Sequence, residues 1–244
     1  MARILVPTDF SKQADYALEL AHQLALEINA EIQILHVLDV PEGESFAGME
    51  NISFTGESSA NTGMNALYFY KLVGKTKERL EKILNRPELK GIKMFEKIQT
   101  GSISRQIIEE TREGKVDLII MGTTGTSDWE EELVGSNAEK VVRKASCPVL
   151  TVRNQVKLTQ IKNIAFASDF KHKDEKQVDL VKKLVKVIGA SLHLIKINTP
   201  SHFENDKINF EAIHSYAREN GLEDYDAHVY NFEDEEDGII SFTE

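Results

Sequence analysis

The segment between Met121 and Asn137, MGTTGTSDWEEELVGSN, places glycines and small hydroxyl residues between an apolar run and a helical pattern. Glycine allows positive φ and lets the backbone approach a ligand closely. The first N–H groups of a helix have no partner within the helix and favour an anion such as phosphate. Hydroxyl and amide side chains add further donors. The pattern G-x₂-G-x₉-G-S-N therefore predicts a phosphate-binding loop that contains Gly122, Gly125, Gly135, Ser136 and Asn137.

A structural interpretation competes with this one. The glycines can shape a turn without any ligand, and Ser136 or Asn137 can be a helix N-cap. Asp9, which follows the first apolar run in VPTDFS, can equally be a cap near Ser11. We favour the binding interpretation for the first half of the chain because the glycines, hydroxyls and amide occur together between a strand and a helix.

Short apolar runs alternate with helical patterns along residues 1–153, which predicts a parallel sheet with helices on both faces. The expected fold is a doubly wound, Rossmann-like α/β domain with five strands. Ligands of such sheets bind beyond the carboxyl ends of the strands, where the glycine segment lies. Residues 42–65, which are rich in Gly, Ser and Asn, are expected to form a long mobile loop. The expected strands are 2–7, 31–40, 91–100, 116–121 and 147–153, and the expected helices are 11–30, 66–85, 103–114 and 137–146.

The chain also repeats itself at a separation of 160 residues. Asp9 and Phe10 align with Asp169 and Phe170, and the apolar positions around them match without a gap. This predicts a duplicated domain, with copies at 1–153 and 162–244 joined by a linker near 154–162. The second copy is expected to be incomplete, because it lacks a glycine loop and the fourth and fifth strands. We therefore expect one nucleotide site per chain, in the first copy, with Asp169 acting only as a cap.

These features together resemble the universal stress protein family, in a tandem form. Its ATP-binding members carry G-x₂-G-x₉-G-[ST] at this position and an Asp after the first strand, here in VPTD. The resemblance covers residues 2–153 fully and roughly 162–244 in part. It implies that Asp9, with Thr8 beside it, meets the ribose and that the main chain of Val37 meets adenine. It also implies that Met121 and Gly122 border the ribose and phosphates, which Gly125, Gly135, Ser136 and Asn137 hold.

The loop departs from the family pattern in its charge. Many members have a His or a basic residue there, whereas this chain has Thr and Ser followed by Asp128 and three glutamates. Less positive charge surrounds the phosphates, so Mg²⁺ is a candidate for compensation. AMP and ADP are alternatives to ATP as the ligand.

Composition excludes several other classes. The net charge of −11 argues against a nucleic-acid or membrane-surface role, which needs an excess of Lys and Arg. The single cysteine, Cys147, excludes a disulfide framework within one chain and favours a cytoplasmic protein. The seven histidines show no metal-binding spacing, and no residue stands out as catalytic, so we expect no metal site of protein ligands and no dedicated enzyme.

The leading hypothesis is a nucleotide-binding stress or signalling module. The alternatives are a slow ATPase, an interaction scaffold with a vestigial site and an adenine-nucleotide α-hydrolase, although VPTDFS lacks the glycines that the last requires. A receiver domain ranks low because Thr100 and Arg153 stand where it needs Asp and Lys. Since an apolar strand edge invites pairing, a homodimer through residues 147–153 is expected.

Overall fold

The computed structural model describes residues 2–39, 60–112, 116–123, 135–171 and 175–244. These residues form two compact units, Met1–Val156 (unit 1) and Lys157–Glu244 (unit 2). No helix in the described ranges is both long enough and apolar enough to cross a membrane.

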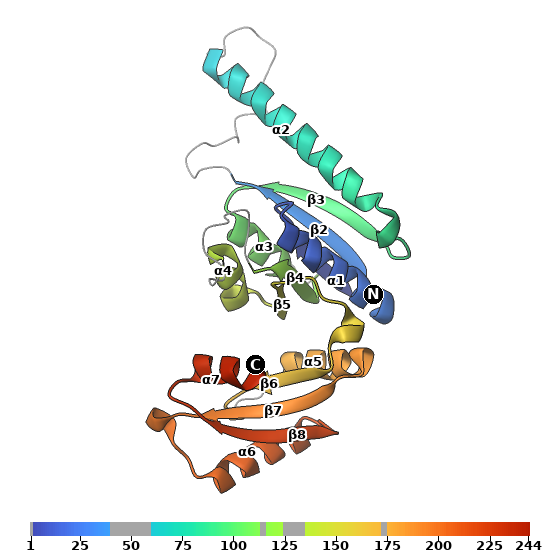
Figure 1. Cartoon of the computed structure of the whole chain (residues 1–244). Helices are drawn as coiled ribbons and strands as arrows, with labels where there is room; N and C mark the ends of the chain where they lie inside the picture. The colour runs from blue at the N-terminus through green and yellow to red at the C-terminus, as the bar shows by residue number, and fades with distance from the viewer. Residues whose placement is uncertain (1, 40–59, 113–115, 124–134, 172–174) are drawn as a thin grey trace. The chain divides into compact units, whose positions relative to one another are not determined.

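Unit 1 is a five-stranded parallel sheet with helices on both faces, which confirms the predicted α/β fold (Figure 1). The strand order is β3-β2-β1-β4-β5. The chain winds outward from β1 to β3 and then returns to β4 on the other side of β1. This reversal leaves a crevice at the carboxyl ends of β1 and β4. The elements are β1 (Arg3–Pro7), α1 (Lys12–Ile28), β2 (Glu31–Leu38), α2 (Ala60–Leu84), η2 (Pro87–Leu89), β3 (Met94–Thr100), α3 (Ile103–Arg112), β4 (Leu118–Gly122), α4 (Ser136–Lys144) and β5 (Val149–Val152).

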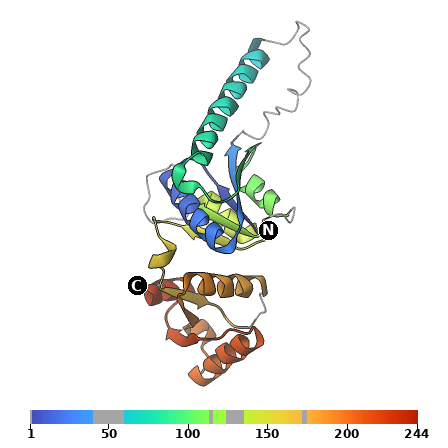
Figure 2. The ribbon, with the colours of Figure 1, turned by 90° about the vertical axis from the view of Figure 1, so that its right-hand side faces the viewer.

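Helices α1 and α3 cover opposite faces of this sheet (Figure 2). Ser11 is the N-cap of helix α1, and its Oγ accepts the N–H of Ala14 at 3.2 Å. Its buried residues recur at helical spacing and include Ala17, Ala21 and Leu24. On the other face, α3 and α4 enclose a core with the strands that contains Leu5, Leu35, Ile107, Ile119 and Val141.

Helix α2 begins at Ala60, so the expected loop is wrong for residues 60–65. The rest of that expectation, residues 42–59, lies outside the described part of the chain. Residues 60–65 show no apolar periodicity and include Gly63, which is why the sequence favours a loop there. A helix that has already formed gains one hydrogen bond for each residue added, and this allows it to continue into such a segment. In Figures 1 and 2, α2 extends beyond the ends of β2 and β3.

Unit 2 contains a three-stranded parallel sheet of order β6-β7-β8. Its register repeats that of unit 1, since Asn163 lies opposite Ser191 where Arg3 lies opposite Glu31. The two registers thus agree at a separation of 160 residues. The elements are η3 (Leu158–Gln160), β6 (Asn163–Ala167), α5 (Glu175–Ile188), β7 (Ser191–Asn198), η4 (Pro200–His202), α6 (Asp206–Glu219), β8 (Tyr225–Asn231) and α7 (Glu235–Thr243).

Candidate functional site

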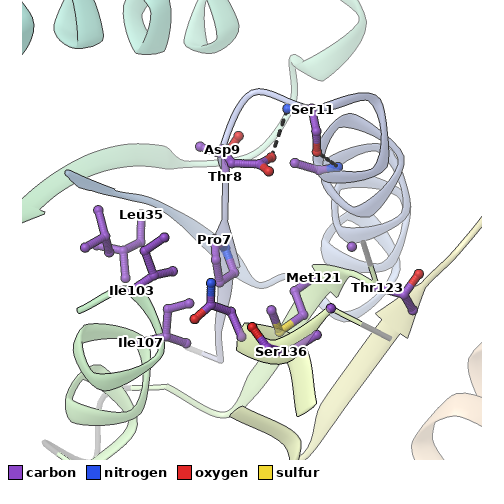
Figure 3. Close-up of a pocket in the computed structure, with 16 residues that line it drawn as sticks. Pro7, Thr8, Asp9, Ser11, Leu35, Ile103, Ile107, Met121, Thr123 and Ser136 are labelled. Atoms are coloured by element: carbon purple, nitrogen blue, oxygen red, sulfur yellow. Dashed lines mark hydrogen bonds between the residues drawn. The ribbon is translucent and has the colours of Figure 1, made fainter. Parts of the chain in front are cut away.

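A cavity of about 310 Å³ opens at the crevice between β1 and β4 (Figure 3). Eight of the nine residues predicted for the nucleotide site line it, namely Thr8, Asp9, Val37, Met121, Gly122, Gly135, Ser136 and Asn137. The ninth, Gly125, lies outside the described residues. The other lining residues are Pro7, Ser11, Ala14, Leu35, Ile103, Ile107, Thr123 and Ala138.

The turn after β1 holds Asp9 at the cavity by a set of short hydrogen bonds. Thr8 Oγ1 accepts the N–H of Phe10 at 3.0 Å, and Asp9 Oδ1 accepts the N–H of Ser11 at 2.9 Å. Phe10 has a φ of 64°, a left-handed conformation that is strained for a residue with a Cβ. The two bonds offset that strain and fix the turn, while the Asp9 side chain remains exposed.

His36 and Arg79 support this turn from outside the cavity, and sequence reasoning missed both. His36 Nδ1 lies 2.7 Å from the Thr8 carbonyl oxygen, and the Arg79 guanidinium lies 3.8 Å from the centre of the Phe10 ring. Burial and the nearby Arg79 charge lower the pKa of His36, and the Thr8 carbonyl and Asp9 oppose them only in part. The imidazole is therefore neutral at neutral pH and donates its Nδ1–H to Thr8.

Gly122 is required by helix packing. A Cβ at this position would lie 2.9 Å from Gln13 Cβ and 3.0 Å from the Gln13 main-chain carbon, distances that real Cβ atoms do not tolerate. Gly122 is not among the positive-φ glycines either. The close approach that glycine permits here is thus between β4 and α1, and the sequence alone did not indicate Gln13 as the partner.

Gly135 is the N-cap of α4, and its N–H is already engaged. It donates to the Thr123 carbonyl at 2.6 Å, which closes the base of the segment between β4 and α4. This amide therefore has an acceptor within the chain, and the part of Gly135 in holding a phosphate stays a prediction. The first bond within the helix runs from Glu139 N–H to the Gly135 carbonyl. An α-helix leaves its first N–H groups without acceptors inside the helix, and here these belong to Ser136, Asn137 and Ala138, which line the cavity.

Apolar side chains form the wall of the cavity beside the Asp9 turn and the N-terminus of α4. Leu35 and Val37 come from β2, and Ile103 and Ile107 come from the first turns of α3. Sequence reasoning missed the two isoleucines. Their spacing of four residues, in a helix that starts at the carboxyl end of a strand, is the signal that would have identified them. The described lining contains no Lys or Arg, and Asp9 is its one charged side chain.

Unit 2 has its own cavity, of about 410 Å³, at the carboxyl ends of β6 and β7. The turn after β6 repeats that of unit 1, because Ser168 Oγ accepts Phe170 N–H at 3.0 Å and Asp169 Oδ1 accepts Lys171 N–H at 2.9 Å. The lining is different in chemistry. Lys171 and Lys196 both form ion pairs with Glu204, and Lys196 Nζ lies 2.5 Å from Glu204 Oε2. The ion pair with Lys196 lowers the pKa of Glu204.

The repeated positions show how the two cavities diverge. Glu235 opens α7 where Ile103 opens α3, so a carboxylate replaces part of the apolar wall. Lys196 takes the position of His36 at a separation of 160 residues. The unit 2 cavity thus offers ion pairs where unit 1 offers an apolar surface. Within the described ranges, no group of three or more His, Cys, Asp and Glu side chains is arranged to hold a metal ion.

Known proteins resemble the chain most clearly over unit 1. The model of the universal stress protein family matches residues 1–153. Universal stress protein MJ0531 of Methanocaldococcus jannaschii is 33% identical over 155 residues, which are 64% of this chain and 84% of that protein. MJ0577 of the same organism is 31% identical over 159 residues, which are 63% of this chain and 95% of that protein.

A solved structure extends the similarity in fold to unit 2. The crystal structure of a universal stress protein from Archaeoglobus fulgidus aligns with a TM-score of 0.67 and 22% identity, and the alignment covers 96% of this chain and 79% of that one. The family match spans well over half of the chain, and the glycine segment, Asp9 and the predicted alternation of strands and helices all occur within it. The chain belongs to the universal stress protein family.

Proposed function

We propose that unit 1 binds an adenine nucleotide, ATP, ADP or AMP, and that the protein acts as a stress-response or signalling module rather than as a dedicated enzyme. The proposal rests on one observation, that the cavity between β1 and β4 combines the Asp9 carboxylate, the N-terminus of α4 and an apolar wall. A nucleoside phosphate has a counterpart for each of these features: ribose hydroxyls for the carboxylate, phosphate for the helix N-terminus and a flat base for the apolar wall.

The base and ribose would occupy the side formed by β1, β2 and α3. Ile103 and Ile107 offer an apolar surface to adenine, and Val37 at the end of β2 offers main-chain polar groups to its edge. Asp9 can accept hydrogen bonds from ribose hydroxyls, because a carboxylate has two oxygens and the Ser11 N–H engages one of them. Thr8 acts mainly by positioning this turn.

The phosphates would lie beside α4. Ser136 and Asn137 contribute main-chain N–H groups and polar side chains, and Met121 and Gly122 border the path from the ribose. We keep Gly125 in the site on the motif alone. Because the described lining has no cationic side chain, we propose Mg²⁺ as the partner of a di- or triphosphate.

The chemistry of the described lining favours binding over catalysis. Asp9 is its one charged side chain, and that side chain already serves the turn after β1. A general base needs to lie within hydrogen-bond reach of an attacking water. Slow ATP hydrolysis and an interaction scaffold with a vestigial site are the alternative outcomes.

The test is to identify the ligand that the protein carries. The full chain is purified without added nucleotide, denatured, and the released small molecules are analysed by mass spectrometry. We expect an adenine nucleotide in the extract, and a rise in melting temperature when the stripped protein receives the same nucleotide with Mg²⁺. If no nucleotide is released and the melting temperature does not shift with ATP, ADP or AMP, the interaction scaffold is the better explanation.

We further propose that residues 162–244 are a second copy of the universal stress protein domain and that the chain forms a homodimer through residues 147–153. The shared register and the repeated Asp9 and Asp169 turns support the first proposal. For the second, β5 is an edge strand of the unit 1 sheet, with β4 as its only strand partner within the described residues.

A further inference from the structure

Two histidines of unit 2 come together on neighbouring strands. His193 of β7 and His228 of β8 have ring centroids 5.3 Å apart, and His193 Nδ1 lies 3.2 Å from His228 Nε2. The ladder places His193 opposite Asp226 and Ile195 opposite His228, so both rings project from the same face of the sheet. The backbone register of two paired strands therefore fixes this pair.

Asn163 on β6 sets the protonation pattern of His193. The amide oxygen Oδ1 of Asn163 lies 3.2 Å from His193 Nε2. Since an amide oxygen can only accept, His193 donates its Nε2–H, and in the neutral ring Nδ1 is then an acceptor with a lone pair. That lone pair faces His228. Histidines that bind metal ions show this arrangement, with the outer N–H held by an oxygen acceptor and the inner nitrogen bare.

The spacing of the two nitrogens fits a tetrahedral metal ion. With Zn–N bonds of about 2.0–2.1 Å, two ligand nitrogens lie roughly 3.3 Å apart. An ion between them would replace the proton that the two rings now share. Asp226 Oδ2 lies 3.6 Å from His193 Nδ1, and its side chain is 69% exposed. The carboxylate thus adds negative charge near the ion on the solvent side, and water can complete the coordination.

Unit 1 provides an internal comparison. At the same positions in its ladder, Gln33 stands where His193 does, and Lys97 stands where His228 does. Those two side chains both bond to Glu110 in a structural network. The histidine pair is therefore a feature of the second copy and does not follow from the shared fold.

We propose that His193 and His228 form a two-histidine site for a borderline divalent metal ion such as Zn²⁺, with water as the further ligands. Imidazole nitrogen suits this class of ion, which also includes Ni²⁺ and Cu²⁺. The two protein nitrogens are preformed, and the remaining ligands assemble on binding. The site is independent of the nucleotide cavity in unit 1.

The test titrates Zn²⁺ into the full chain, produced without a polyhistidine tag, in competition with a chromophoric chelator. We expect one Zn²⁺ per chain and an affinity that falls at least about tenfold in His193→Gln and in His228→Gln. Asn163→Ala, which removes the outer oxygen acceptor, is expected to weaken binding about 10- to 100-fold. His202→Gln is the matched control, because this histidine belongs to the same unit, is 81% exposed, and should bind as in the wild type.

Histidine NMR signals keep the proposal testable if a variant unfolds. In the wild-type chain, Zn²⁺ should shift the imidazole resonances of His193 and His228 before those of the other histidines. Zn²⁺ affinity that is unchanged in both single variants, each folded by circular dichroism, would overturn the proposal. So would a titration in which His202 responds first.

Discussion

At Gly122 the end of β4 touches α1 so closely that no side chain fits. We expect Gly122→Ala to lower the free energy of unfolding by about 1–3 kcal/mol, because the added Cβ meets the Gln13 main chain, which cannot move aside. Urea denaturation monitored by circular dichroism measures this. Gly74→Ala is the control, since a Cβ there meets nothing within 4 Å and the helix should gain about 0.5–1 kcal/mol. A Gly122→Ala midpoint at or above that of the wild type would contradict the packing role.

Gly122 and Gly135 show what a glycine motif in the sequence can predict and what it cannot. Gly122 and Gly135 of the motif both line the cavity. It did not show that Gly122 packs on Gln13 or that the Gly135 amide bonds to Thr123, because both partners depend on how distant segments meet. A glycine pattern predicts where the backbone comes close to something, and the tertiary fold decides what that is.

At the level of single elements, two substitutions in the first turn of α4 distinguish phosphate binding by the main chain from phosphate binding by a side chain. Ser136→Pro removes the first helical N–H, and proline fits this position because Gly135 has an extended ψ of 141°. Ser136→Ala removes only the hydroxyl. We expect Ser136→Pro to weaken nucleotide binding by about tenfold or more, since a hydrogen bond to a charged group contributes about 1.5–3 kcal/mol. Isothermal titration calorimetry compares the two, and equal affinities would show that the α4 amide does not contact the phosphate.

Helix α3 is tied to β2 and β3 through the buried carboxylate of Glu110. Burial raises the pKa of Glu110, but hydrogen bonds and charge from Lys97, with bonds from Gln33 and Gln99, outweigh it and hold the pKa below the ordinary 4.5. A carboxyl whose pKa is depressed in the folded state stabilises that state above its unfolded pKa. This stabilisation is lost as the pH falls through the folded value.

We therefore expect Glu110→Gln to flatten the loss of stability on acidification below about pH 4.5. Urea midpoints at a series of pH values down to about pH 3 measure the slope. Glu109→Gln is the matched control on the same helix, because Glu109 pairs with Arg105 and its side chain is 42% exposed. If the slope for Glu110→Gln equals that of the wild type, the network does not contribute in this way.

The sequence predicted the existence and order of these elements better than their ends. Alternating apolar runs and helical patterns were enough to place all five strands of unit 1. The start of α2 was placed too late because residues 60–65 lack periodicity and helix propagation carries them. Ile103 and Ile107 were overlooked as cavity residues because their helical spacing identifies them only together with the position of α3 directly after the carboxyl end of β3.

At the scale of the whole molecule, β5 determines the expected assembly. Ile119 and Thr123 donate to the carbonyls of Pro148 and Val152, so the alternate residues of β5 direct their main-chain groups to the open edge. Thr151→Pro removes one of those outward N–H groups while sparing the bonds to β4. We expect a dimer for the wild type and a monomer for Thr151→Pro in light scattering after size exclusion. A monomeric wild type at micromolar concentration would contradict the dimer.

The two units also show what a repeat in the sequence predicts and what it leaves open. The alignment at 160 residues anticipated the matching turns at Asp9 and Asp169. It did not anticipate the charged cavity or the histidine pair, because both join residues that are far apart along the chain. Histidine spacing carries a metal signal only when the ligands belong to one local segment.

We propose that one nucleotide binds per chain, in unit 1, through Asp9. Asp9→Ala and Asp169→Ala are matched variants, since each removes the same turn hydrogen bond from one copy. Isothermal titration calorimetry with ATP and Mg²⁺ should give one site per chain for the wild type and for Asp169→Ala. For Asp9→Ala the affinity should fall by about tenfold or more, as expected when ribose hydroxyls lose a charged acceptor. Two sites per chain, or equal affinity in Asp9→Ala and Asp169→Ala, would contradict the account.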